Sequence, residues 1–97
     1  MIDEALAERA AQTFSEVTLK KWPHPRTEIQ DDYEFVLLSV DVPLHLAVNK
    51  IEFEERKAVV LALNALMPVP PSEPLGTWIV VFLQDGEVYE SILPNDL

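Results

Sequence analysis

Residues 77–93 contain two mostly apolar stretches that are joined by Asp85-Gly86. The first stretch is β-branched or aromatic almost throughout, which favours a strand. Asp-Gly between two such stretches is typical of a type I′ turn, because both central residues of that turn need a positive φ. The pattern therefore predicts a β-hairpin with a two-residue turn, and we expect the other elements to pack around it.

The length of the turn fixes the register of this hairpin. With two residues in the turn, three cross-strand pairs are expected: Leu83 with Val88, Phe82 with Tyr89 and Ile79 with Ile92. Apolar side chains then fall on both faces of the first strand. We expect a helix to cover one face, and a second layer or a second subunit to cover the other.

A helix is predicted over residues 2–21, because apolar residues recur there every three or four positions with acidic residues between them. The apolar positions are Ile2, Leu6, Ala10, Phe14 and Val17. Trp22-Pro23 should end this helix, since a residue that precedes proline disfavours the α conformation.

The next segments predict one strand and leave a second one open. Residues 23–32 are polar and should form a connection, whereas residues 33–42 are rich in β-forming residues and predict a strand. Pro43 interrupts ladder hydrogen bonds, so residues 44–48, if they are extended, would form a short strand at an edge of the sheet.

Residues 49–67 permit two interpretations. Asn49 and Glu52 fit a capping box, and Glu52 and Arg56 have the spacing of an i,i+4 ion pair, so these features predict a helix. The alternative is a pair of strands over residues 51–54 and 58–66. No Gly, Asn or Asp lies near Arg56 to form the turn that such a hairpin needs, which favours the helix.

These elements together predict a single α+β domain over residues 1–97. Two helices would lie on an antiparallel sheet of three or four strands, in two layers and in the order α-β-(β)-α-β-β. A chain of 97 residues with 48% hydrophobic content is large enough to form a core without disulfides or metal.

The charge of the chain narrows the classes of partner. Lys and Arg number 7 against 17 Asp and Glu, which gives a net charge of −10, and no Lys or Arg follows Lys57. This charge repels nucleic acid and anionic lipid and attracts basic protein surfaces. The simpler interpretation is that acidity only keeps the protein soluble. The absence of cysteine and of any long apolar run leads us to expect a cytoplasmic protein without a membrane span.

The sequence contains no recognisable motif for catalysis or cofactor binding. His24 and His45 lack the spacing of metal ligands, and the carboxylates at positions 31, 32 and 34 lack the central glycine of a calcium loop. Neither glycine lies in a phosphate-binding pattern, and no serine, Ser15 included, lies in a nucleophile motif. We therefore expect no catalytic residue, no cofactor and no metal.

These properties indicate a protein-binding module that covers a basic or apolar surface of a partner protein. It would act as an inhibitor or immunity-type protein, or as a client-specific chaperone. Six residues are predicted to contact the partner through charge or as aromatic anchors: Trp22, Asp31, Asp32, Glu87, Tyr89 and Glu90. Trp22 is expected to be the most exposed of the aromatic residues. The alternatives are a homo-oligomeric structural subunit, possible as a homodimer, and a small-ligand protein or enzyme with an unrecognised pocket.

Overall fold

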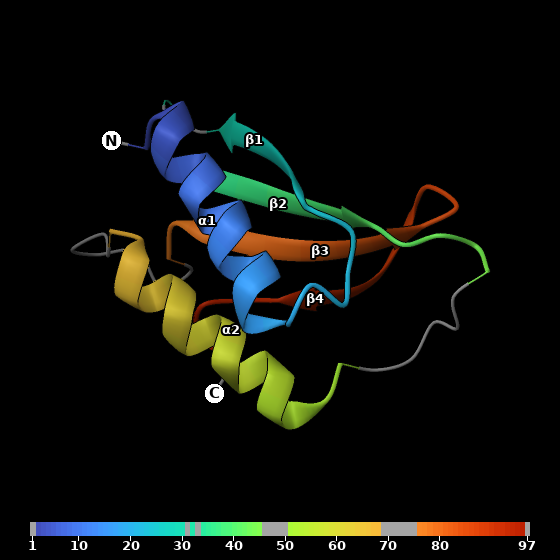
Figure 1. The fold of residues 1–97 in the computed structure, drawn as a ribbon. Coiled ribbons are helices and arrows are strands. Elements are labelled where there is room, and N and C mark those ends of the chain that lie inside the picture. Colours follow the sequence, from blue (N-terminus) through green and yellow to red (C-terminus); the bar gives the residue numbers. More distant parts are fainter. Residues whose placement is uncertain (1, 31, 33, 46–50, 69–75, 97) are drawn as a thin grey trace.

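A computed structural model describes residues 2–30, 32, 34–45, 51–68 and 76–96. Its elements are α1 (Glu4–Val17), β1 (Arg26–Gln30), β2 (Phe35–Asp41), α2 (Phe53–Leu66), β3 (Trp78–Gln84) and β4 (Glu87–Ile92). Both helices lie on the same face of a four-stranded sheet (Figure 1). This arrangement confirms the predicted α+β class, its two layers and the order α-β-β-α-β-β. No helix in the described ranges is long and apolar enough to cross a membrane.

The sheet has the spatial order β1-β2-β3-β4 and is mixed. β1 pairs antiparallel with β2, and β3 pairs antiparallel with β4, but the central pair of β2 and β3 is parallel. The prediction of a wholly antiparallel sheet is therefore wrong for the central pair. The physical reason is α2, which lies between these strands in the chain and returns it to the end of the sheet where β2 began.

The strand β1 corrects a second expectation. The sequence predicts a polar connection over residues 23–32, but Arg26–Gln30 forms an edge strand. An edge strand has only one neighbouring strand and stays largely in contact with water. Its sequence therefore need not alternate apolar and polar residues, and without that alternation the sequence did not predict a strand here. The short strand considered over residues 44–48 does not start at Leu44, because Leu44 and His45 lie in a turn. Residues 46–48 lie outside the described residues.

Helix α1 begins with a cap and ends earlier than predicted. Asp3 is its N-cap, and one of its carboxylate oxygens accepts a hydrogen bond from the Leu6 N–H at 2.8 Å. The helix ends at Val17 because Leu19 and Lys20 both adopt φ of 57°. The Thr18 hydroxyl also donates to the Phe14 carbonyl at 2.7 Å and closes the last turn. Trp22-Pro23 consequently lies beyond the helix rather than at its end.

Helix α2 confirms the helical interpretation of this segment over the pair of strands. It begins at Phe53, and Glu52 is its N-cap without a side-chain hydrogen bond. The predicted start at Asn49 is therefore wrong, although Asn49 itself lies outside the described residues. The Arg56 side chain does not pair with Glu52 as the spacing suggested, because it reaches β4 instead.

The hairpin of β3 and β4 confirms the predicted two-residue turn, with φ of 54° at Asp85 and 80° at Gly86. Of the predicted pairs, Leu83 does lie opposite Val88. A β-bulge between Phe82 and Leu83 then shifts the register, so that Phe82 pairs with Glu90, and Ile92 pairs with Val80. The other two predicted pairs are wrong because Tyr89 is the extra residue of this bulge.

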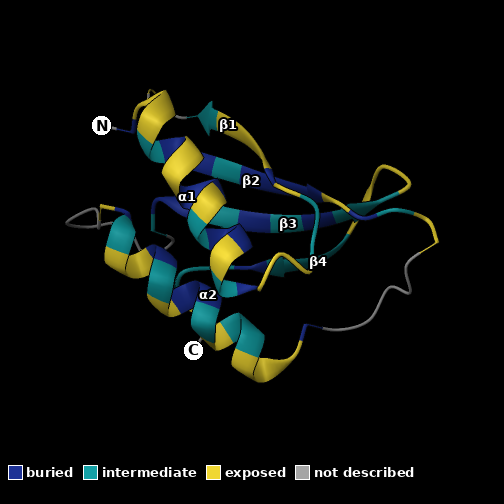
Figure 2. Ribbon diagram, in the orientation of Figure 1, coloured by how far each residue is buried: buried dark blue, intermediate teal, exposed yellow. Residues whose placement is uncertain are grey.

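The core fills the space between the helices and the sheet (Figure 2). Alternate residues of β3, namely Trp78, Val80 and Phe82, point into it and are buried. The Phe82 ring lies at its centre, with ring centroids of three other aromatic residues within 6.3 Å: Phe14, Trp22 and Tyr89. Side chains from α1, from the segment after α1 and from β4 therefore meet at Phe82.

Candidate protein-binding surface

Neither helix covers the second face of the sheet (Figure 1). β3 carries apolar side chains on that face. In β3, Ile79, Val81 and Leu83 alternate with the core residues and keep partial exposure. We call this surface the open face and define it by its apolar residues: Phe35, Leu37, Ile79, Val81, Leu83 and Val88. Val88 is 57% exposed. The open face meets the expectation of apolar side chains on both faces of this strand.

Polar residues border the open face along β1 and at the end of β2. Arg26 donates two hydrogen bonds to the Asp41 carboxylate, the longer of them 3.0 Å, across the antiparallel pair. This hydrogen bonding to Arg26 holds the pKa of the Asp41 carboxyl below its ordinary value. The Arg26 charge is thus matched within the chain, whereas Glu28 beside it is exposed and has no described ion-pair partner.

Acidic residues also lie at the two opposite ends of the sheet. Asp32 and Glu34 are exposed in the connection between β1 and β2. Asp85 and Glu87 are exposed at the turn between β3 and β4, which is at the other end because β2 and β3 run parallel. We call the residues Glu28, Asp32, Glu34, Asp85 and Glu87 the acidic rim of the sheet. The predicted contact residues Asp32 and Glu87 belong to it, and Asp31 lies outside the described residues.

Trp22 has a different setting from the one expected. Its ring lies 5.0 Å from that of Phe82, edge to face, and its indole N–H donates to Glu55 at 3.2 Å. Lys21 covers the ring, with Nζ 5.0 Å from its centroid. The expected exposure of Trp22 is therefore wrong, because the ring packs against the core between α1 and α2. Its role in partner binding stays a prediction.

Tyr89 and Glu90 both face the helices, because a bulge turns two successive side chains toward one face. The Tyr89 ring contacts Phe82 with centroids 6.3 Å apart. Its hydroxyl is buried and has no hydrogen-bond partner in the described part of the chain. Burial, and secondarily the charge of Glu90, raises the pKa of this phenol.

Replacement of Tyr89 by phenylalanine tests this environment. We expect the free energy of unfolding to stay unchanged or to rise by about 1 kcal/mol, because the substitution removes a buried hydroxyl without a partner. With its raised pKa, Tyr89 contributes stability below about pH 10 that is lost as pH rises through the folded value, and the variant should lack this loss. Urea denaturation at neutral and alkaline pH measures both effects. A loss above about 1 kcal/mol would mean that the hydroxyl has a partner.

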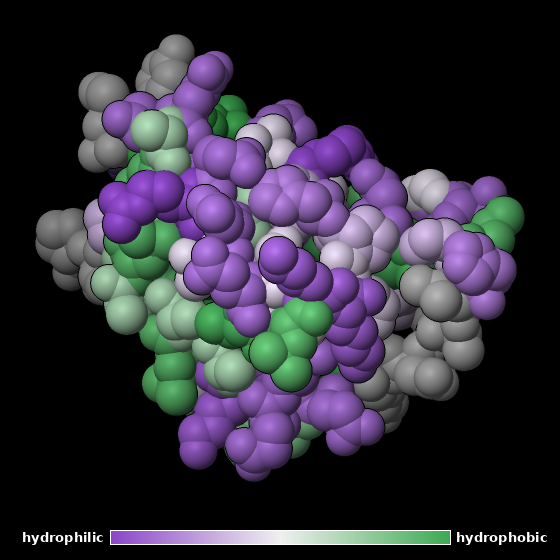
Figure 3. All heavy atoms as spheres, viewed as in Figure 1, coloured by the Kyte–Doolittle hydropathy of each residue, from purple (hydrophilic) through white to green (hydrophobic). Residues whose placement is uncertain are grey.

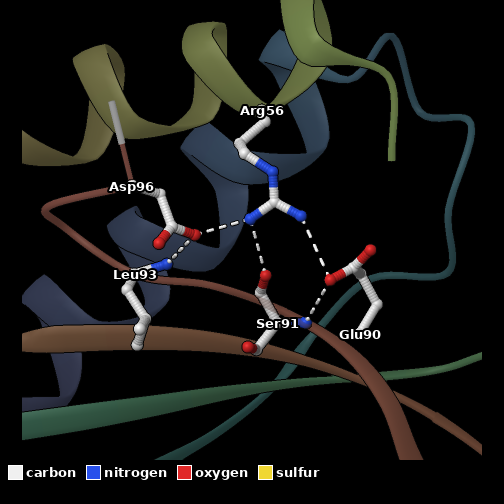
Figure 4. Close-up of polar contacts among 5 residues, drawn as sticks. All are labelled: Arg56, Glu90, Ser91, Leu93 and Asp96. Atoms are coloured by element: carbon white, nitrogen blue, oxygen red, sulfur yellow. Dashed lines mark hydrogen bonds and ion pairs between the residues drawn. The ribbon is translucent and has the colours of Figure 1, made fainter. Parts of the chain in front are cut away.

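Arg56 joins α2 to β4 and to the segment after it (Figure 4). One guanidinium nitrogen, Nη1, donates to the Ser91 carbonyl at 2.7 Å and to Asp96 at 2.5 Å, and Nη2 lies 3.1 Å from a Glu90 oxygen. The Arg56 side chain is 19% exposed. Asp96 also accepts from the Leu93 N–H at 2.9 Å. Glu90, a predicted partner-contact residue, therefore forms an ion pair within the chain that links β4 to α2.

A second polar chain links α1 to the segment that follows it. The Ser15 hydroxyl lies 3.2 Å from Nδ1 of His24, and Nε2 of His24 lies 2.7 Å from Glu8. The residue types are those of a hydrolytic triad, but Ser15 is 9% exposed and lies near the C-terminal end of α1. At that end the helix dipole is negative and does not stabilise an oxyanion. The arrangement can tether His24 to α1.

Comparison with known proteins gives no information on function, so the functional argument depends on the surfaces of the chain itself. No protein-family model, curated protein or solved structure matches the chain. Among the described residues, no group of three or more His, Cys, Asp or Glu residues is placed to hold a metal ion. The helix-covered face is mostly hydrophilic, with apolar side chains gathered over the C-terminal half of α2 (Figure 3).

Proposed function

We propose that this chain is a small acidic protein-binding module that covers an apolar surface of a partner protein with the open face of its sheet. One observation carries the proposal: β3 is apolar on both faces, and the helices cover only one of them. An apolar sheet face left in water is a common mark of a protein interface. The module would act in the cytoplasm as an inhibitor or immunity-type protein, or as a chaperone of one client.

The size of the open face indicates that the rim takes part in binding. Four strands spaced about 4.8 Å apart and about 20 Å long offer a flat area of about 400 Å². A standard protein interface buries about 800 Å² on each partner. Even the whole sheet face is therefore smaller than a standard interface, so the residues at its two ends, which are mainly acidic, must also contact the partner.

The charge of the rim favours a basic partner over a second copy of the chain. Glu28 lies on β1, Asp32, Glu34, Asp85 and Glu87 lie at the two ends of the sheet, and the chain has a net charge of −10. Two copies joined through this face would bring like charges together, which opposes association. A partner surface with an apolar centre and a Lys- or Arg-rich border would be complementary to the open face and to the acidic rim. The acidic rim would also raise the association rate of such a partner.

A matched pair of charge substitutions tests the proposal. Val81→Lys places a charge in the centre of the open face, and Leu61→Lys places the same charge on α2, where Leu61 is 55% exposed. Both variants and the wild type are used to capture proteins from the native cell extract. We expect the wild type and L61K to retain the same basic protein and V81K to bind it at least about tenfold more weakly, because a buried unpaired charge is costly.

Two outcomes of this capture contradict the proposal. Equal retention by V81K and the wild type would show that the open face is not the binding surface. Self-association of the wild type in sedimentation, abolished by V81K, would assign the open face to a second copy and favour the homo-oligomeric subunit instead.

A further inference from the structure

The edge strand β1 has hydrogen-bonding groups that its sheet leaves unused. β1 pairs with β2 on one side only, because it is the first strand in the order β1-β2-β3-β4. The N–H and C=O groups of alternate residues therefore point away from the sheet. Its first three residues are exposed, so this edge is open to another chain.

A hollow lies between this strand and α1. It has a volume of about 520 Å³ and is lined by Glu4, Glu8, Thr27 and Ile29. The two carboxylates lie one helical turn apart on α1, and the two β1 residues belong to the helix-facing side of the strand. The hollow is therefore acidic on its helical wall and mixed on the side of the strand.

The spacing of the carboxylates suits the side chains of an added strand. Residues four apart on a helix are separated by about 6 Å along its axis, and side chains two apart on a strand by about 7 Å. Two alternate side chains of a strand beside β1 can thus reach Glu4 and Glu8. Glu8 uses one oxygen on His24 and keeps the other for a donor. Glu4 has no described partner.

From this geometry we infer that β1 accepts an extended segment of another protein, in which Lys or Arg residues alternate with small or β-branched ones. The segment adds a fifth strand through backbone hydrogen bonds, and its basic side chains enter the hollow and pair with Glu4 and Glu8. The nearest positive charge on β1, that of Arg26, is held by Asp41 and so does not repel the segment. This site is separate from the open face.

A blocked peptide of about seven residues that alternates Lys with Thr is the probe for this site, because β1 has room for a strand of about that length. Amide chemical shifts of the labelled protein report where it binds. We expect the resonances of Thr27, Glu28 and Ile29 to move and the double variant E4Q/E8Q to bind about three- to fivefold more weakly, as expected for two exposed ion pairs. The control E16Q removes one exposed charge from the same helix and should bind like the wild type.

Further probes separate this inference from general electrostatic attraction and from the proposed function. A peptide of the same sequence with a methyl group on every backbone nitrogen keeps the lysine charges, lacks all of the N–H donors and should not bind. V81K should bind the Lys-Thr peptide normally, since it alters only the open face. Equal weakening by E16Q and E4Q/E8Q, or equal binding of the N-methylated peptide, would overturn the inference. Concentration-dependent shifts of the β1 amides without peptide would overturn it too, because they would assign this edge to a second copy.

Discussion

Replacement of Phe82 by alanine is expected to lower the free energy of unfolding by about 3–5 kcal/mol, a large fraction of the stability of a small domain. Phe82 is fully buried on β3. Its ring is the common neighbour of Phe14 on α1, of Trp22 in the following segment and of Tyr89 in the bulge. The truncation leaves a cavity between elements that cannot all move inward, because close-packed cores relax only partly.

Urea denaturation followed by circular dichroism measures this loss. Val88→Ala on the same hairpin is the control, because Val88 is 57% exposed and should change stability by no more than about 0.5 kcal/mol. Phe82→Leu keeps an apolar side chain of intermediate volume and should fall between the two. A loss below about 1 kcal/mol for Phe82→Ala would contradict the central position of this ring in the core.

Replacement of Arg56 by methionine is expected to lower the free energy of unfolding by about 2–4 kcal/mol. The substitution keeps most of the packing of the side chain but leaves the carboxylates of Glu90 and Asp96, each 23% exposed, without their common partner. It also removes the hydrogen bond to the Ser91 carbonyl. Because the two carboxylates are partly exposed to water, the expected loss of stability is smaller than for a fully buried ion pair.

The neighbouring residue supplies a matched control for Arg56. Lys57→Met removes one positive charge from an exposed position of the same helix and should change stability by about 0.5 kcal/mol or less. Adding E90Q and D96N to Arg56→Met should restore part of the loss, because both carboxylates are then neutral. Equal stabilities of the Arg56→Met and Lys57→Met variants in thermal or urea denaturation would show that the cluster contributes nothing beyond a surface charge.

The sequence predicted the elements whose signals are local. The period of the apolar residues in α1, the absence of turn residues within α2 and the Asp85-Gly86 turn each lie within a few positions of the structure they determine. For the same reason the sequence predicted apolar side chains on both faces of β3, which the structure shows. These signals were sufficient for the fold class and for the apolar part of the candidate surface.

The features that the sequence missed depend on distant residues. β1 forms because β2 offers a partner, and its own residues carry no strand pattern. The bulge at Tyr89 directs Glu90 toward Arg56, and this contact joins residues 34 positions apart. Trp22 precedes Pro23 and Pro25, which suggest an exposed loop, yet the early end of α1 brings its ring onto Phe82. Contacts between residues so far apart in the chain leave no short sequence pattern from which they could be predicted.

Binding through the open face is tested most directly by amide chemical shifts of the labelled chain during titration with the protein that the wild type captures and V81K does not. We expect the perturbed amides to lie around Leu37, Val81 and Val88, with the outer sides of α1 and α2 unchanged. Binding should weaken at about 0.5 M salt, where the Debye length is about 4 Å and the acidic rim is screened. Perturbations confined to the helices, or binding that salt does not change, would contradict recognition of a basic partner through this face.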